Sequence, residues 1–284
     1  MKVSLCITTF NEEKSIGKLL DSISVQTRKP DEIIIVDGGS KDKTVEIIQS
    51  YERIRLIISK GASIAKGRNI AVKNAKYPII AMTDAGCVCE KHWFERISLD
   101  EDVTAGFYKM TGNSDFQIAL KLFLGIMPEK FDPKSFLPST RSITFRKSVW
   151  KKVGGFNEKL DRAGEDTQFN IQIINHKFQI VRVRNAIVYW EMPNTFFDAA
   201  KKFFYYARGD AQMGITTSHN IRVLTIFLRY IIFIFIWPLF FVYLLFPIWK
   251  FRKYNFDWLT RFWTVIIQLI SDFSVMLGFI AGLI

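Results

Sequence analysis

Residues 33–44 read IIIVDGGSKDKT, an apolar and largely β-branched run that ends at an acidic residue and a pair of glycines. Two further short apolar runs, residues 3–8 and 79–82, also lead directly into polar residues. Stretches with the apolar spacing of a helix, residues 16–23 and 63–75, lie between these runs. Strands that alternate with helices at this spacing predict right-handed βαβ units and a parallel sheet.

The polar residues after the three predicted strands are expected to share one edge of the sheet. The first loop reads TTFNE at residues 8–12, the second DGGS at residues 37–40 and the third TDAG at residues 83–86. In open α/β sheets, ligands bind beyond the carboxyl ends of the strands, so the loops predict a pocket for a polar, phosphorylated ligand. The chain has no G-x-G-x-x-G after the first strand and no Walker lysine loop, so we expect neither a dinucleotide dehydrogenase nor a P-loop NTPase.

The composition points to anionic partners. The formal net charge is +12 at pH 7, which favours phosphate groups, nucleotides or an anionic lipid surface. We do not expect nucleic acid as a partner, because the sequence shows no lysine and arginine stripe and no nucleic-acid motif. The cysteines, Cys6, Cys87 and Cys89, suggest no disulfide framework, and the N-terminus lacks a signal-peptide layout. The catalytic part is therefore predicted to be cytoplasmic.

The middle of the chain gives a looser pattern. Residues 116–127 form an apolar run that is too short to span a bilayer, and we interpret it as a core helix rather than a helix at a membrane surface.

Asn11 is predicted to cap the first helix. The other expected elements are strands at 55–58, 142–145, 178–183 and 186–189 and helices at 45–48, 147–153 and 165–174.

The tail is predicted to enter a membrane. Residues 230–249 contain no charge and are rich in isoleucine, leucine, phenylalanine and valine, which favours insertion as a helix, with Pro238 as the expected site of a kink. Residues 262–284 form a second apolar stretch, but its Asp272 is costly at the bilayer centre unless it faces a partner or water. We expect two transmembrane helices. A re-entrant or interfacial hairpin is the alternative, because a basic loop opposite a cytosolic catalytic domain conflicts with the positive-inside rule.

Six motifs together make the first two hundred residues resemble a family 2 glycosyltransferase with the GT-A fold. They are TFNE at 9–12, DGGS-x-D-x-T at 37–44, GRN at 67–69, TDAG at 83–86, GGF at 154–156 and ED at 165–166. The resemblance implies an α/β, Rossmann-like catalytic domain with a mostly parallel sheet in residues 1–200. It does not cover the tail, which we divide into a juxtamembrane segment, residues 201–229, and a membrane region of two hydrophobic helices, residues 230–284.

The resemblance implies donor-binding roles for residues in the first two loops. Thr8, Thr9 and Glu12 would sit beneath the nucleoside, and Asp37 would hydrogen-bond the base or the ribose. Many relatives carry a second carboxylate directly after this aspartate, whereas this chain has Gly38. The choice between a uridine and a guanosine donor therefore stays open.

The resemblance also gives roles to the charged residues further along. Arg68 is expected to point at the donor diphosphate and to neutralise it. The family's Asp-x-Asp metal loop is reduced here to Asp84, so a Mg²⁺ or Mn²⁺ ion would have one carboxylate ligand beside phosphates and waters. Asp166 matches the base that takes the proton of the acceptor hydroxyl, and Glu165 would orient it or the donor sugar. Arg208 is expected to reach donor or acceptor phosphate, or equally lipid head groups.

We therefore expect a membrane-associated, metal-dependent, inverting glycosyltransferase that moves a sugar from a UDP- or GDP-sugar to a lipid-linked or membrane-proximal acceptor. The alternative is a non-catalytic membrane scaffold or sugar-nucleotide-binding module, which the shortened metal motif favours. A nucleotidyltransferase is not expected, because the first loop carries no glycine-rich, basic sequence. The Gln-x-x-Arg-Trp motif of processive relatives is missing from the sequence, which favours single addition.

Overall fold

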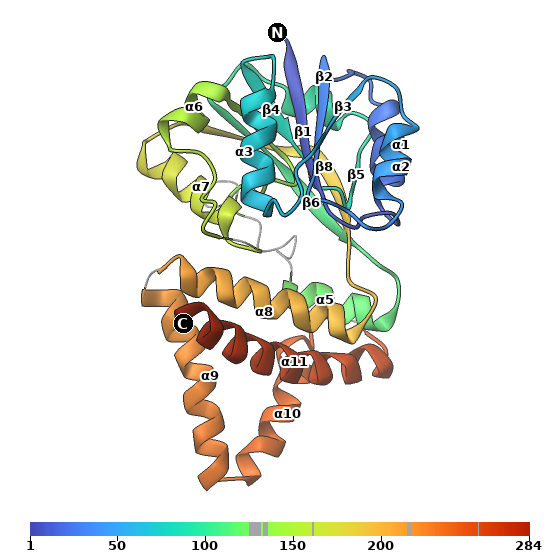
Figure 1. The fold of residues 1–284 in the computed structure, drawn as a ribbon. Helices are drawn as coiled ribbons and strands as arrows, with labels where there is room; N and C mark the ends of the chain where they lie inside the picture. Colours follow the sequence, from blue (N-terminus) through green and yellow to red (C-terminus); the bar gives the residue numbers. More distant parts are fainter. Residues whose placement is uncertain (125–131, 133–135, 161, 215–216, 255) are drawn as a thin grey trace. The chain divides into compact units, whose positions relative to one another are not determined.

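The chain folds into two compact units in a computed structural model, which describes residues 1–124, 132, 136–160, 162–214, 217–254 and 256–284 (Figure 1). The first unit comprises Met1–Lys109 and Asp132–Glu191, and the second comprises Met110–Phe131 and Met192–Ile284. The domain boundaries expected at residues 200 and 229 fall inside helices, since α8 is Phe196–Gln212 and α9 is Thr217–Phe235.

An eight-stranded sheet with the order β3-β2-β1-β4-β7-β6-β8-β5 organises the first unit. Its strands are β1 (Val3–Thr9), β2 (Glu32–Asp37), β3 (Ile54–Ile58), β4 (Ile79–Met82), β5 (Cys87–Cys89), β6 (Val103–Thr111), β7 (Ile143–Arg146) and β8 (Ile180–Glu191). The first four strands form a parallel block, in which β1 lies between β2 and β4. β7 pairs antiparallel with both β4 and β6, and β5 pairs antiparallel with β8. The predicted α/β fold with its parallel N-terminal strands is confirmed.

Helices cover both faces of this sheet (Figure 1). α1 (Ile16–Ser24) and α2 (Thr44–Gln49) lie on one face, and α3 (Ile64–Asn74), α6 (Lys147–Lys152) and α7 (Glu165–Asn175) lie on the other. The short helix α4 (Trp93–Ile97), which the sequence did not predict, packs against β8. α1 buries Ile16, Leu19, Leu20 and Ile23, the apolar stripe that predicted the helix.

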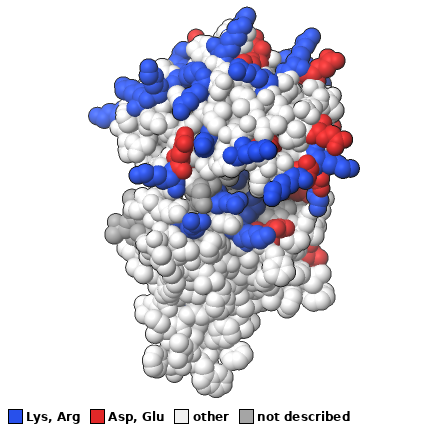
Figure 2. All heavy atoms as spheres, in the orientation of Figure 1, with Lys and Arg blue, Asp and Glu red and all other residues white. Residues whose placement is uncertain are grey.

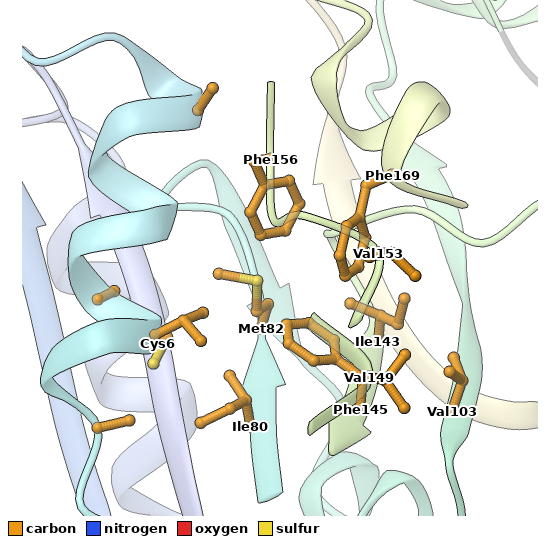
Figure 3. Packing of buried hydrophobic residues seen from close by; sticks show 14 of the residues in the cluster. Cys6, Ile80, Met82, Val103, Ile143, Phe145, Val149, Val153, Phe156 and Phe169 are labelled. Carbon is orange, nitrogen blue, oxygen red and sulfur yellow. The ribbon is translucent and has the colours of Figure 1, made fainter. Parts of the chain in front are cut away.

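Three phenylalanines fix the start of α7 on the sheet (Figure 3). The rings of Phe156 and Phe169 stack with their centroids 4.3 Å apart, and Phe145 of β7 meets Phe169 edge-on at 5.1 Å. All three side chains are buried. Because this packing holds α7 in place, it also holds the acidic pair at the first turn of the helix.

Two local predictions in the first unit were wrong, and one strand was missed. The strands predicted at 178–183 and 186–189 are replaced by one strand, β8 (Ile180–Glu191), which starts two residues later than predicted and continues through the exposed Arg184 and Asn185. β5, which pairs with β8, was not predicted at all. Asn11 does not cap α1: its backbone is left-handed, with φ 55°, and its side chain accepts a hydrogen bond from the Lys41 N–H at 2.9 Å.

The second unit is helical. It contains α5 (Asp115–Leu124), α8, α9, α10 (Pro238–Lys250) and α11 (Trp258–Leu283). The core-helix prediction for residues 116–127 is confirmed as far as Leu124, since α5 packs on α11 with Phe116 5.1 Å from Trp263. Residues 125–127 lie outside the described residues.

The expected single helix over residues 230–249 is wrong. The chain turns at Ile236 and Trp237, and α10 starts at Pro238. Proline has no N–H to donate, and its ring clashes with the carbonyl four residues earlier, so it ends the preceding helix. Among the described residues, α11 is the one helix long and apolar enough to cross a bilayer, by length and composition.

Candidate active site

The three polar loops share one edge of the sheet, as predicted. Thr9 at the end of β1 lies beside Asp37 at the end of β2, and β4 runs parallel on the other side of β1. The Gly38 N–H donates to the Thr9 carbonyl at 2.9 Å, so the first two loops are joined directly. The carboxyl ends of β1, β2 and β4 thus form the floor of the candidate site.

Asp37 shapes the second loop from within. Its side chain is fully buried, and it accepts hydrogen bonds from the Gly39 and Ser40 N–H groups at 2.8 Å and from the Ser40 hydroxyl at 2.5 Å. Gly39 has a left-handed φ of 96°, which glycine adopts without strain. The Ser40 hydroxyl also accepts from the Asn11 N–H at 2.8 Å. Asp37 therefore holds the loop geometry, and its contact with a base or ribose stays a prediction.

The other residues predicted to bind the nucleoside also lie at this edge. The Glu12 N–H donates to the Thr44 hydroxyl at 2.7 Å, and the Ser15 hydroxyl donates to the Glu12 carboxylate. Thr8 is partly exposed, whereas Thr9 is buried and its hydroxyl has no hydrogen-bond partner among the described residues. A buried hydroxyl without a partner is costly, so the Thr9 hydroxyl is a group that a ligand at this edge could satisfy.

Arg68 is the centre of the site. Its side chain is buried, its Nη2 donates to Asp84 Oδ1 at 2.9 Å and its Nη1 pairs with Glu165 Oε1. The guanidinium also lies over the Phe156 ring, 5.7 Å from its centroid. This arginine therefore joins α3, the loop after β4 and the start of α7, which are far apart in sequence. The carboxylates beside it raise the pKa of Arg68, although burial alone would lower it.

Glu165 and Asp166 differ in their surroundings. Glu165 is buried, and among the described residues its Oε2 has no hydrogen-bond partner. Burial raises the pKa of Glu165, and the Arg68 charge opposes that rise. Asp166 is only partly buried, and its carboxylate accepts from the Thr167 N–H at 2.8 Å and the Ser139 hydroxyl at 3.4 Å. Glu165 thus pairs with Arg68 in the interior, while the Asp166 carboxylate is partly exposed.

Arg141 completes the site, and sequence reasoning missed it. Its Nε lies 3.9 Å from Asp84 Oδ2, its Nη1 donates to the Ser139 hydroxyl at 3.0 Å, and its guanidinium stacks 4.0 Å from the centroid of the Trp190 ring. The residue precedes β7, a strand that was predicted without a direction. Because β7 is antiparallel to β4, its amino end lies at the carboxyl end of β4 and brings Arg141 to Asp84.

Asp84 is the one predicted metal ligand. One carboxylate oxygen faces Arg68 and the other faces Arg141, and the side chain is 28% exposed. The part of the chain that the structure describes has no group of three His, Cys, Asp or Glu residues that could hold a metal. These residues fit a divalent cation that shares one protein carboxylate with phosphates and water, and they do not fit an all-protein cage.

Arg208 is the last of the predicted site residues. It belongs to α8 in the second unit, whereas Arg68, Asp84, Arg141, Glu165 and Asp166 all belong to the first. Its role at donor or acceptor phosphate stays a prediction.

Residues 4–100 match the family model described as glycosyl transferase family 2. The chain is 24% identical over 213 residues to the uncharacterized glycosyltransferase EpsJ of Bacillus subtilis, an alignment that covers 68% of this chain and 62% of EpsJ. The chain therefore spans about three fifths of the length of that relative.

Two solved structures share the fold at low sequence identity. One is TarS 1–349 of S. aureus in complex with UDP-GlcNAc, with a TM-score of 0.53 at 21% identity over 74% of this chain and 66% of TarS 1–349. The other is the mannosyltransferase PcManGT of Pyrobaculum calidifontis in complex with GDP-Man and Mn²⁺, with a TM-score of 0.55 at 15% identity over 72% of this chain and 61% of that one. The predicted GT-A fold is confirmed.

Proposed function

We propose that the chain, whose residues 4–100 match the glycosyl transferase family 2 model, transfers a sugar from a nucleotide-diphosphate sugar to an acceptor with inversion at the anomeric carbon. The observation that carries the proposal is the cluster of Arg68, Asp84 and Glu165, with Asp166 next to it, at the carboxyl edge of the parallel strands. The donors in the TarS and PcManGT structures, UDP-GlcNAc and GDP-Man, support the donor class and leave the base open.

In the proposed reaction the acceptor oxygen forms a bond to the anomeric carbon as the bond from that carbon to the diphosphate breaks. Asp166 takes the proton of the acceptor hydroxyl on the face opposite the leaving group. Arg68 and Arg141 hold the diphosphate through charge-assisted hydrogen bonds, and the nucleoside diphosphate leaves. Glu165 fixes the orientation of Arg68. Thr8, Thr9, Glu12 and Asp37 would form the nucleoside side of the pocket.

Charge balance at the site favours a divalent cation. The two guanidinium groups of Arg68 and Arg141 already face the carboxylates of Asp84 and Glu165, with Asp166 also acting on Arg68. These residues therefore offer no excess positive charge to an incoming diphosphate. A Mg²⁺ or Mn²⁺ ion held by Asp84 and the phosphates would supply that charge and stabilise the leaving group. The Mn²⁺ in the PcManGT structure supports this assignment.

The acceptor is proposed to be lipid-linked or close to a membrane, with the catalytic unit on the cytoplasmic side. The apolar helix α11 supports the membrane association. Transfer assays would compare a lipid-linked acceptor in detergent with its soluble head group. We expect faster transfer to the lipid-linked acceptor, and equal rates would contradict this part of the proposal. Pyrophosphate release in place of a nucleoside diphosphate would indicate a nucleotidyltransferase.

Donor binding tests the metal assignment. UDP- and GDP-sugars are added to the protein in detergent with and without Mn²⁺, and unfolding is followed by thermal shift. We expect one donor class to stabilise the protein only with Mn²⁺, by about 2.7 kcal/mol at 100 times its Kd. Asp84→Asn should lose this shift. The control Asp100→Asn, which changes an exposed aspartate paired with Arg146 at 2.6 Å, should keep it. An equal thermal shift without metal would contradict the assignment of a metal ion to Asp84. Donor binding without transfer to any acceptor would favour the non-catalytic alternative.

Arg141→Lys should weaken donor binding. Lysine keeps the charge but cannot stack on Trp190 and present a planar fork to phosphate at the same time. We expect the KM for the donor to rise by about tenfold while kcat changes less, because the fork contributes mainly to binding. Arg55→Lys is the control, since Arg55 is exposed and donates hydrogen bonds to Asn74, away from the site. An unchanged donor KM would show that Arg141 serves only the packing around Asp84.

A further inference from the structure

The second unit presents an apolar hairpin. Its two legs, α9 and α10, meet at a turn formed by Ile236 and Trp237. Phe233 of α9 joins them through ring contacts to Phe240 at 5.6 Å and Tyr243 at 5.4 Å. The sequence carries no charge from residue 230 to residue 249. The hairpin is seen at the foot of Figure 1, and its surface is free of Lys, Arg, Asp and Glu on the face drawn in Figure 2.

The tip of the hairpin exposes large apolar side chains. Ile234 is 77% exposed, Phe235 80% and Trp237 67%. A hydrophobic segment of this size with no charge is not stable facing water, and such patches mark sites of association with membranes or proteins. The hairpin therefore needs an apolar environment.

A cluster of polar side chains lies where the charge-free residues 230–249 of the hairpin begin. Asp272 of α11 is buried and accepts hydrogen bonds from the hydroxyls of Tyr243 at 2.5 Å and Tyr230 at 3.2 Å and from the Gln268 amide at 2.9 Å. Arg229, the last charged residue before the tip, lies 3.5 Å from the same carboxylate. The ion pair of Arg229 and Asp272 has no net charge. Through it and the Tyr243 hydrogen bond, both legs of the hairpin contact α11. This contact resolves the expected cost of Asp272, since it faces a partner.

The charge-free part of the hairpin is too short to cross a bilayer. From Arg229 to Phe235 the rise is about 9 Å, and the 13 residues of α10 span about 20 Å. The hydrocarbon core of a bilayer is about 30 Å thick. The tip therefore reaches into one leaflet, and the chain must return to the side from which it entered.

α11 is long enough to span a bilayer, but it packs against another helix. It packs along α8, and two glycines allow the close approach: a Cβ at Gly278 would lie 2.1 Å from the Phe204 carbonyl, and one at Gly282 would lie 2.5 Å from the Arg208 carbonyl. α8 carries charged residues, among them the exposed Lys201. A spanning α11 would draw those charges into the hydrocarbon, which is costly. The packing favours α11 lying with α8 at the membrane surface.

We infer that the chain binds a membrane from one side, with the α9–α10 hairpin inserted into a single leaflet and α11 lying at the surface rather than spanning. The basic residues at the base of α10, Lys250, Arg252 and Lys253, would meet anionic lipid head groups. The hairpin tip would carry the apolar part of the binding. This inference is independent of the donor chemistry, and its tests need no activity.

Cysteine labelling distinguishes the topologies. Single cysteines replace Lys201 on α8, Lys253 after α10 and Ile284 at the end of the chain, all of which are exposed. The native cysteines are buried, so the unmodified protein gives the background. Sealed membrane vesicles of one orientation are treated with a membrane-impermeant maleimide. We expect all three sites to react from the same side. Two spans would place Lys253→Cys on the opposite side, and a spanning α11 would place Ile284→Cys there; either result would overturn the inference.

Flotation with vesicles tests the hairpin directly. The double variant Phe235→Asp/Trp237→Asp should reduce flotation of the full chain with phosphatidylcholine–phosphatidylglycerol vesicles by about tenfold or more, because two large apolar side chains leave the lipid. The matched control Val25→Asp/Ile174→Asp alters two exposed apolar residues of the first unit and should leave flotation close to that of the unmodified protein. Unchanged flotation of the tip variant would contradict the inference. A dimer that dissociates only in the tip variant, without vesicle binding, would show that a second copy covers the hairpin.

Discussion

Asp166→Asn is expected to lower kcat by about 100- to 10,000-fold while donor binding stays close to that of the unmodified protein. Asparagine has the shape of aspartate, so its oxygen can accept from the Thr167 N–H while its amide N–H donates to the Ser139 hydroxyl, which faces the second oxygen of the aspartate. It cannot take a proton from the acceptor hydroxyl. Transfer rates at saturating donor, together with thermal shift by the same donor, would separate loss of chemistry from loss of binding.

The matched control for this variant is Glu46→Gln. Glu46 is an exposed acid in the first turn of α2, as Asp166 is an acid in the first turn of α7. If Asp166 did no more than interact with the positive end of its helix, both variants would lose at most about 1 kcal/mol of stability and little activity. Near-normal transfer by Asp166→Asn would contradict its role as base and would point to an acceptor phosphate that is already ionised.

The parallel half of the fold could be predicted because its signals are local. The β-branched run that ends at Asp37 and the run that ends at Met82 each became a strand, and the loops after them met at one edge because parallel strands place their carboxyl ends together. Arg68, Asp84 and Glu165 could be named from motifs, and the structure brings them into contact.

The other features of the fold and the site depend on interactions between residues far apart in the sequence, which local patterns do not predict. Arg141 reached Asp84 only because β7 inserts antiparallel beside β4, and the direction of a strand is set by its partners. Asp37 turned out to bond its own loop, which its position in the motif does not reveal. Pro238 was expected to kink one helix, but local sequence does not show whether a chain continues past a proline as a kinked helix or turns into a second helix, as it does here.

Arg68→Met should cost about 3–5 kcal/mol of unfolding free energy, because it removes one partner of a buried ion pair and leaves the other uncompensated. Glu165 is buried with it, and the second oxygen of that carboxylate has no hydrogen-bond partner among the described residues. The control is Arg146→Met. Arg146 pairs with the exposed Asp100 at 2.6 Å, and loss of an exposed pair should cost at most about 1 kcal/mol. Urea unfolding of the full chain in detergent would measure both.

Two further measurements separate the buried charge from simple loss of packing. The double variant Arg68→Met/Glu165→Gln should recover part of the lost stability, since it removes the uncompensated carboxylate. The single variant should also depend on pH. Burial raises the pKa of Glu165, and loss of the Arg68 charge raises it further. A carboxyl whose pKa is higher in the folded than in the unfolded chain binds a proton on folding. The loss of unfolding free energy in Arg68→Met should therefore be largest at neutral pH, and it should shrink as the pH falls toward the ordinary glutamate pKa. The loss of unfolding free energy could instead be independent of pH and unchanged in the double variant. That result would mean that Arg68 stabilises the fold by packing on Phe156, and not by pairing with the acidic residues of the site.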